Sequence, residues 1–394
     1  LVVLSNNDGC AIARSEEAKT LGIEMGTPAF MIKDIIKNQQ VQVFSSNYTL
    51  YGDISDRVMQ TMGSFVPRLE IYSIDEAFLD MHDLPYSDLL YLGVEIKNTV
   101  RKNIGIPVTI GIAQTKTLAK MANRFAKKHR RDTGVFWAGN NELLNEMLSA
   151  TPVKDVWGIG HQHALLLKKN GIHTALELSK VPEEWVRVNM SVVGQRLLNE
   201  LKGIPSIEWE FDTPAKKNIC TSRSFGFLLS EKDIINEAIC NHAAACAYKL
   251  RKQQSCCTLV HIFIQTNLHR MFDQQYSRSI NVTLETASND TSVIMKAASK
   301  GLDLIFKKGY RYMKCGVIVS GLVPQTVVQN NLFQQPDHER TARMMKALDG
   351  INKSLGKDLV RYAVQGYERK YRIKAAYLSK KFTTDLNQVL KVNN

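Results

Sequence analysis

Apolar residues recur at strand or helix spacing along most of the chain. Runs of β character occupy residues 1–4, 10–13, 69–79 and 108–112, and helical patterns cover 50–62 and the stretch from 116 onward. From 219 to 320 the expected order is strand, helix, strand, strand, helix, strand, which is typical of a compact two-layer unit. We therefore predict an α+β protein with several domains.

Two adjacent carboxylates, Asp75 and Glu76, interrupt the run at 69–79. Successive strand side chains point to opposite faces, so both acids can share one ligand only where the strand ends or turns. A divalent cation would be such a ligand, because Mg²⁺ takes one or two carboxylates together with phosphate oxygens. Taken alone, the pair fits a solvated acidic turn equally well.

Basic residues lie at two junctions between a strand and a helix. Lys116 opens a predicted helix and shares one of its faces with Lys120, and the apolar face comprises Leu118, Met121, Ala122 and Phe125. A lysine in a first helical turn is well placed to meet phosphate, because the backbone amides there also point at the anion. Arg14 and Lys19 lie at the corresponding junction near the start of the chain, where they fit either a triphosphate site or ordinary surface charge.

A glycine-containing pattern follows, Val156-Trp157-Gly158-Ile159-Gly160, with Gly171-Ile172 downstream. This pattern is typical of a helix-hairpin-helix. Its glycines let backbone amides approach a DNA phosphate with no side chain in the way, so it holds DNA irrespective of base sequence.

Composition narrows the function further. The chain has 394 residues and a formal charge of +13, which predict two to four domains and a polyanionic partner such as nucleic acid, or else merely a basic soluble protein. Its apolar runs are shorter than the roughly 20 residues that a membrane helix needs, and we see no leader pattern, so we expect a cytoplasmic protein without membrane contact. Seven cysteines without a C-x-x-C pair favour buried reduced thiols over zinc or disulfides.

Basic residues also mark the later part of the chain. Arg223, Arg270 and Arg278 would line the sheet of the 219–320 unit as cations that follow a DNA backbone, or would be ordinary exposed charges. The final 61 residues carry 13 Lys and Arg against 6 Asp and Glu, which indicates an interaction segment.

These motifs together resemble the Y-family translesion DNA polymerases over essentially the whole chain. The shared features, in order and spacing, are Ser73-Ile74-Asp75-Glu76, the stretch from Gly111 to Lys116 with Lys120, and Val156 to Gly160. Three further stretches are similar to the UmuC-type subgroup, the catalytic subunits of bacterial DNA polymerase V and plasmid-borne relatives. They are Asn6-Asn7-Asp8-Gly9-Cys10, Phe44-Ser45-Ser46-Asn47-Tyr48 and Arg223-Ser224-Phe225-Gly226.

The resemblance implies error-prone synthesis past lesions in the SOS response, in which a primer 3′ hydroxyl attacks the α-phosphate of a dNTP with two Mg²⁺ ions. Asp75 and Glu76 would hold the metal ions, and Lys116, Lys19 and Arg14 would bind the triphosphate. Primed, damaged DNA would meet Gly158, Ile159 and Gly160 in the thumb and Arg223 and Ser224 in the little finger. The implied right-hand polymerase comprises fingers (1–47), palm (48–137), thumb (138–213), little finger (218–322) and a clamp-binding, basic C-terminal region (323–394).

The connector after the little finger holds Gln329, Leu332 and Phe333, a Q-x-x-L-F pattern similar to the motif by which bacterial polymerases dock on the sliding (beta) clamp. Leu332 and Phe333 would fill an apolar pocket on the clamp, or alternatively cap the neighbouring sheet. A UmuD′-type accessory dimer and RecA are further implied partners, and the protein would be associated with the nucleoid.

One departure concerns the family's first strand, which carries a third metal carboxylate and an aromatic residue that excludes the ribose 2′ hydroxyl. We expect that strand to lie before Leu1 in the full-length protein. Two alternatives stay open: a non-catalytic DNA- and clamp-binding accessory subunit, and another palm-fold nucleotidyl transferase such as a cyclase. The carboxylate pair speaks against the first, and the thumb pattern against the second.

Overall fold

The structure, a computed structural model, describes residues 1–82, 84, 88–211, 214–328, 338–356, 358–368, 371 and 374–390. The chain forms two compact units, and each combines segments that are distant in sequence. The first unit comprises 1–46 and 214–379, and the second comprises 47–213 and 380–394. Among the described helices, none has both the length and the apolar character needed to cross a membrane.

The first unit contains a small three-stranded sheet in the order β2-β1-β3. Strand β1 (Val2–Leu4) pairs antiparallel with β2 (Ala11–Arg14) and parallel with β3 (Val43–Ser45), which confirms the strands predicted at both early runs. The 3-10 turn η1 (Asn6–Asp8) joins β1 to β2, and helices α1 (Glu16–Thr20) and α2 (Lys33–Asn38) follow. The Ser15 hydroxyl accepts the Ala18 amide at 3.4 Å and so caps the start of α1.

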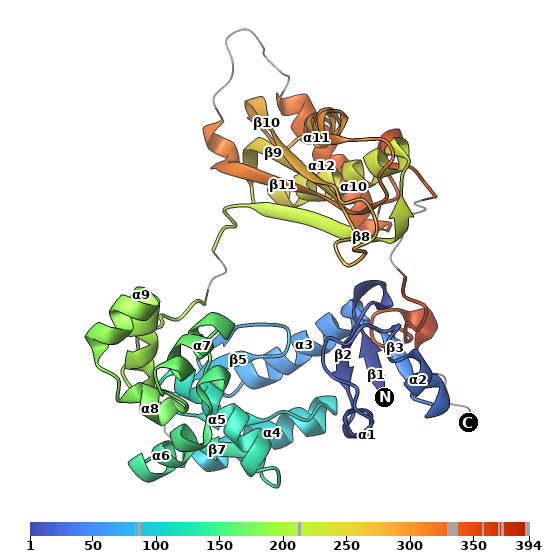
Figure 1. Ribbon diagram of the computed structural model, residues 1–394. Coiled ribbons are helices and arrows are strands. Elements are labelled where there is room, and N and C mark those ends of the chain that lie inside the picture. The colour runs from blue at the N-terminus through green and yellow to red at the C-terminus, as the bar shows by residue number, and fades with distance from the viewer. Residues whose placement is uncertain are drawn as a thin grey trace. The chain divides into compact units, whose positions relative to one another are not determined.

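A larger antiparallel sheet, in the order β10-β9-β11-β8, forms the body of the first unit. Its elements are β8 (Ile219–Leu229), α10 (Lys232–Lys252), β9 (Ser255–Thr266), β10 (Ser277–Ser288), α11 (Thr291–Ile305) and β11 (Tyr312–Pro324). This order is the predicted one. Helices α10 and α11 lie together on one side of the sheet (Figure 1) and enclose a continuous apolar core.

Five cysteines are buried, as predicted, whereas Cys10 is half-buried and Cys220 is exposed. Burial raises the pKa of the Cys246 thiol to about 11 and that of Cys257 to about 12. These thiols therefore stay protonated at neutral pH and act as small apolar side chains.

The C-terminal part of the first unit is folded, which its sequence pattern did not predict. Helix α12 (His338–Ser354) follows the 3-10 turn η3 (Gln325–Val327), and a further turn, η4 (Ala363–Gln365), comes next. The Arg251 guanidinium of α10 holds both carboxylate oxygens of Asp349 at 2.7 Å, and so fixes α12 to the body of the unit.

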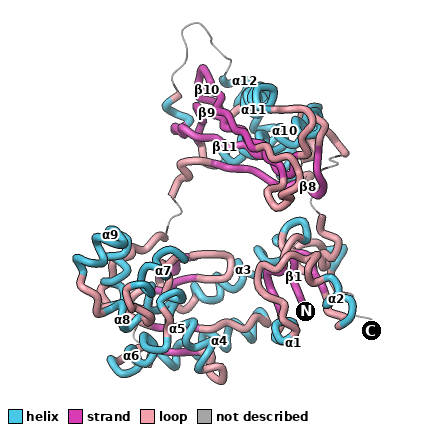
Figure 2. The backbone as a smooth tube through the Cα atoms, viewed as in Figure 1, coloured by secondary structure: helices cyan, strands magenta, loops and turns pink. Residues whose placement is uncertain are grey.

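The second unit consists mainly of helices with short strands between them (Figure 2). Its helices are α3 (Tyr48–Gly63), α4 (Leu89–Ile104), α5 (Lys116–His129), α6 (Asn141–Ala150), α7 (His161–Lys169), α8 (Ala175–Ser179) and α9 (Glu183–Leu201), with 3-10 turns η2 (Val153–Asp155) and η5 (Leu386–Gln388). Strands β4 (Arg68–Ile71) and β5 (Ala77–Asp80) form an antiparallel hairpin, and β6 (Ile110–Ile112) pairs parallel with β7 (Val135–Trp137).

The run at 69–79 is therefore two strands joined by a turn, not one strand. Asp75 and Glu76 lie in that turn, the one place where two adjacent strand residues can face a common ligand.

Candidate active site

The turn between β4 and β5 presents the two acidic side chains at the tip of a hairpin. The Tyr72 and Ser73 amides both donate to the Glu76 carbonyl, at 3.1 and 3.0 Å, and close the turn. The Ser73 hydroxyl donates to Asp75 Oδ1 at 2.6 Å. Asp75 and Glu76 are exposed, so a ligand can reach their carboxylates.

Lys116 begins α5, as predicted, but its ammonium group is buried and already paired. It lies 2.5 Å from Glu70 Oε2, and the two side chains are only 6% and 9% exposed. It also donates to the Glu208 carbonyl at 2.6 Å and faces the ring of Trp209, whose centroid is 4.8 Å away. In this conformation Lys116 therefore neutralises a buried carboxylate of β4 and does not face the acidic turn as a free cation.

Lys120 lies one helical turn further along α5 and pairs with the acidic turn itself. Its Nζ is 3.0 Å from Glu76 Oε2, with side-chain exposures of 20% for Lys120 and 50% for Glu76. The same ammonium group lies over the rings of Tyr72 and Trp157, at 4.3 and 5.0 Å. Lys120 was not predicted as a site residue, although its i+4 spacing from Lys116 was a usable signal.

An aromatic cluster connects the hairpin to the glycine pattern. Tyr72 packs edge-on against Phe78 and Trp157, with ring centroids 5.8 and 5.5 Å apart. Trp157 immediately precedes Gly158, so this contact joins the acidic turn to the start of the helix-hairpin-helix.

A buried carboxylate positions the segment that covers Lys116. Glu200, 1% exposed, accepts the Thr117 amide at 3.0 Å and the Ser206 and Ile207 amides at 2.7 and 3.2 Å. The chain then continues to Glu210, whose amide donates to Glu70 at 2.8 Å. The covering segment 206–210 is therefore held at both ends by carboxylates.

The acidic turn has a donor set that fits a hard divalent cation. Asp75 and Glu76 offer carboxylate oxygens from an exposed turn, and Mg²⁺ completes such a partial set with water or phosphate oxygens. Among the described residues, no group of three or more His, Cys, Asp or Glu side chains is arranged to hold a metal ion.

The glycine pattern folds as one turn, in which the Ile159 amide donates to the Val156 carbonyl at 3.1 Å, followed by the start of α7. Gly158 has φ +94°, which a side chain would strain, and Gly160 precedes α7. Among the described residues beyond its local chain neighbours, no heavy atom lies within 4 Å of where a Gly160 Cβ would stand, so the space at this position is open. The Ile159 side chain is 8% exposed and belongs to the core. It contributes packing, and the backbone provides the accessible surface.

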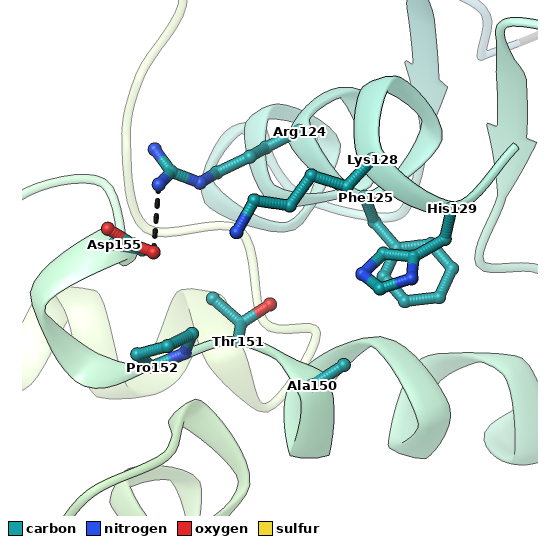
Figure 3. A pocket seen from close by; sticks show the side chains of 8 residues that line it. All are labelled: Arg124, Phe125, Lys128, His129, Ala150, Thr151, Pro152 and Asp155. Atoms are coloured by element: carbon teal, nitrogen blue, oxygen red, sulfur yellow. Dashed lines mark ion pairs between the residues drawn. The ribbon is translucent and has the colours of Figure 1, made fainter. Parts of the chain in front are cut away.

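A pocket lies beside this motif, at the C-terminal half of α5 (Figure 3). Its basic side chains are Arg124, Lys128 and His129, and Arg124 forms an ion pair of 2.8 Å with Asp155 of η2. Neither Asp75 nor Glu76 lines this pocket. The ion pair fixes the helix-hairpin-helix to α5, and the pocket is separate from the acidic turn.

Arg14 and Lys19 belong to the first unit, whereas Lys116 and the acidic turn belong to the second. Arg14 Nη1 donates to the Ile23 carbonyl at 3.1 Å, and Lys19 pairs with Glu16 at 2.6 Å. Both cations therefore have local partners in this conformation.

The arginines predicted to line the large sheet lie in different places. Arg223 is exposed on β8, two residues before the buried Phe225, and strand alternation places it on the same side as α10. The Ser224 carbonyl accepts the Asn7 side chain at 3.0 Å. Arg270 lies in the connection between β9 and β10, and Arg278 lies on β10. Gln329, Leu332 and Phe333 lie outside the described residues.

Family profiles match three segments of the chain. The impB/mucB/samB family matches residues 1–124, its C-terminal domain matches 216–332, and a "Domain of unknown function (DUF4113)" matches 342–392. Protein UmuC of Salmonella typhimurium is 42% identical over 100% of this chain and 94% of its own length. Protein ImpB of the same organism is 37% identical over 98% of this chain and 91% of its own length.

More distant proteins also match over most of the chain. DNA polymerase IV of Clostridium acetobutylicum is 25% identical over 90% of this chain and 87% of its own length. A solved Y-family DNA polymerase chimera of Dbh and Dpo4 superposes with a TM-score of 0.61 and 18% identity, covering 82% of this chain and 92% of its own. The chain therefore belongs to the impB/mucB/samB family and has the fold of the Y-family DNA polymerases.

Proposed function

We propose that the chain is a DNA-directed DNA polymerase that copies damaged templates, with its chemistry at the turn between β4 and β5. The observation that supports this site most directly is the pair of exposed carboxylates, Asp75 and Glu76, closed into one turn beside the lysine face of α5. A non-catalytic accessory subunit would have no need for this exposed acidic pair.

In the proposed reaction, the primer 3′ hydroxyl loses its proton and attacks the α-phosphorus of a dNTP, and pyrophosphate leaves. Dependence on divalent metal follows from membership of the family, and we infer that Asp75 and Glu76 hold two Mg²⁺ ions. Bound there, the ions would neutralise the charge that develops on the attacking and leaving oxygens.

Both Lys116 and Lys120 of α5 would contact phosphates of the dNTP, Lys120 more readily than Lys116. Lys120 is partly exposed and pairs with Glu76, and its ammonium group would be available to a phosphate if Glu76 held a metal ion. Lys116 can reach a triphosphate only if its ammonium group leaves Glu70 and the Glu208 carbonyl. Binding of dNTP by Lys116 would therefore break both of these contacts. Arg14 and Lys19 are proposed as further triphosphate ligands.

DNA would be held mainly through its phosphates. The backbone at Gly158 and Gly160 carries no side chain that would keep a phosphate away, and the first-turn amides of α7 would donate to the same phosphate. Arg223 and Ser224 would add contacts from the little finger. We assign the fingers to 1–47, palm to 48–137, thumb to 138–213, little finger to 218–322 and the C-terminal region to 323–394.

Further partners are proposed from family membership and from sequence. Gln329, Leu332 and Phe333 would anchor the sliding clamp, and a UmuD′-type dimer and RecA would assemble on the enzyme. Replacing both Leu332 and Phe333 with Ala should abolish clamp-stimulated synthesis and leave unstimulated synthesis unchanged. Clamp binding at unaltered affinity would refute this anchor.

The test of the site is primer extension with Mg²⁺ by Asp75→Asn and Glu76→Gln in the full-length protein. Each change keeps the side-chain shape and removes one charge, and should abolish extension while leaving DNA binding nearly intact. Glu142→Gln is the matched control, because Glu142 is an exposed acid in the first turn of α6. Extension at the wild-type rate by either site variant would overturn the assignment.

A further inference from the structure

The turn η1 (Asn6–Asp8) has an unusual backbone for residues other than glycine. Asn7 has φ 62° and Asp8 has φ 51°, both in the left-handed region that few side chains adopt. The stretch Asn6 to Cys10 is one of those that are similar to the UmuC-type subgroup, yet the proposed chemistry uses none of it. Its polar side chains therefore need another explanation.

Both side chains bind backbone groups of the C-terminal region. Asn7 Oδ1 accepts the Lys374 amide at 3.1 Å, and Asp8 Oδ2 accepts the Ala376 amide at 2.9 Å. Asp8 Oδ1 accepts the Ser45 hydroxyl at 2.6 Å, and the Ser45 oxygen in turn accepts the Tyr377 amide at 3.0 Å. Three amides within four consecutive residues are thus bound by one turn and one serine.

The same segment adds to the small sheet. The Ser45 amide donates to the Tyr377 carbonyl at 2.9 Å, and Ser45 forms a parallel bridge with Leu378. β3 is an edge strand in the order β2-β1-β3, and residues 374–378 pair with that edge at Ser45, the last residue of the strand. This is the geometry by which an extended peptide is recognised at a sheet edge.

The chain just before this segment is bound to the large sheet of the same unit. The Asn241 amide group of α10 donates to the Tyr371 hydroxyl at 2.6 Å and to the Gln365 carbonyl at 2.7 Å. Tyr371 also packs edge-on against Phe225 of β8, with ring centroids 6.2 Å apart. One stretch of the C-terminal region thus contacts both sheets of the first unit.

We propose that η1 and the edge of β3 form a binding site for residues 374–378, and that the C-terminal region is a strap that joins the small sheet to the little finger. This gives a role to the matched domain of unknown function. Asn7 strengthens the connection, because its Nδ2 donates to the Ser224 carbonyl of β8 while its Oδ1 binds the strap. The proposal does not depend on the catalytic assignment.

The test is amide hydrogen exchange in the full chain carrying Asp8→Gly. Glycine adopts φ 51° without strain, so this variant removes the carboxylate and keeps the turn. The Ala376 and Tyr377 amides should exchange on the order of tenfold faster. The Ala376 amide loses its acceptor, and the Tyr377 amide loses the carboxylate that orients its acceptor, the Ser45 hydroxyl. Gln40→Gly is the matched control, since Gln40 is an exposed residue of the same unit with φ 49° and should leave the strap unchanged. Unaltered exchange at 376 and 377 would overturn the proposal.

A second variant tests the strap from its other side. Ala376→Pro removes an amide donor from the strap and leaves every residue of the small sheet in place. The Ser45 amide should then exchange faster, because its acceptor is the Tyr377 carbonyl, while the β1–β2 pairing stays protected. If Asp8→Gly unfolds the small sheet, this variant decides the question, and an unchanged Ser45 amide would refute the strap.

Discussion

Lys116 and Lys120 lie one turn apart on α5, and each forms an ion pair with a carboxylate of the β4–β5 hairpin. The two pairs differ mainly in their exposure. Lys116 and Glu70 are 6% and 9% exposed at 2.5 Å, whereas Lys120 and Glu76 are 20% and 50% exposed at 3.0 Å. Neither member of the first pair can lose its partner without leaving a buried charge. The second pair can exchange its partner for water or a ligand. The comparison indicates that the buried pair, Lys116 and Glu70 (the inner pair), holds the structure around the site. The exposed pair, Lys120 and Glu76 (the outer pair), is accessible to the substrate.

The largest expected effect comes from removing the charge of Glu70. Glu70→Gln leaves the buried Lys116 ammonium without its counter-charge, and should lower the free energy of unfolding by about 3 kcal/mol. The measurement is urea unfolding of the full chain. Glu76→Gln, the equivalent change in the exposed pair, should cost less than about 1 kcal/mol. If both variants lowered the free energy of unfolding equally, the two ion pairs would not differ in their contribution to stability.

His242 is a buried titratable group whose charged neighbours are cations, in contrast to Lys116, whose neighbour is a carboxylate. Burial, and then the nearby Arg223 and Lys249, lower the pKa of His242 from 6.5 to about 4. Below pH 6.5 the unfolded chain therefore binds a proton that the folded chain does not, so stability falls as the pH falls toward 4. Between pH 7 and 5 this should lower the free energy of unfolding by about 2 kcal/mol. Urea unfolding at both pH values measures it, and His242→Gln should lose this part of the dependence.

Nucleotide kinetics of Lys116→Ala test whether the inner lysine leaves its partner during the reaction. If it does, the dNTP KM should rise or kcat should fall on the order of tenfold, as for loss of one charge-assisted contact. Lys116→Ala also leaves Glu70 without its counter-charge. Glu70→Gln breaks the same ion pair but keeps the lysine, so it is assayed as a control, at a temperature where both variants are folded. Kinetics within about twofold of wild type would confine Lys116 to a structural role.

The smallest expected effect concerns the stability contribution of the outer pair. Lys120→Met should change the free energy of unfolding by less than about 1 kcal/mol, and this difference should shrink as salt is raised. Melting of wild type and variant at low and high salt measures it. A large, salt-independent loss would show that Lys120 is structural, like Lys116.

Much of the fold could be predicted because its signals are local. The order of strands and helices from 219 to 320 follows from periodicity and turn residues, and the cap at Ser15 follows from its spacing to an acidic first turn. The start of α5 at Lys116 was also predicted. Helix α12 was not, because it follows a polar connector and its charged surface hides its few buried residues, such as Met345.

The residues themselves determined which groups can carry chemistry: an acidic pair that must lie at a turn, a lysine face on one helix, and two glycines with an accessible backbone. Only the tertiary structure decided which of these groups are paired. Lys116 is paired with Glu70, 46 residues earlier, and with the Glu208 carbonyl, 92 residues later. Similarly, the partners of Asp8 include Ala376, 368 residues away. Periodicity reports on neighbours along the chain, whereas burial and ion pairing depend on segments that only folding brings together.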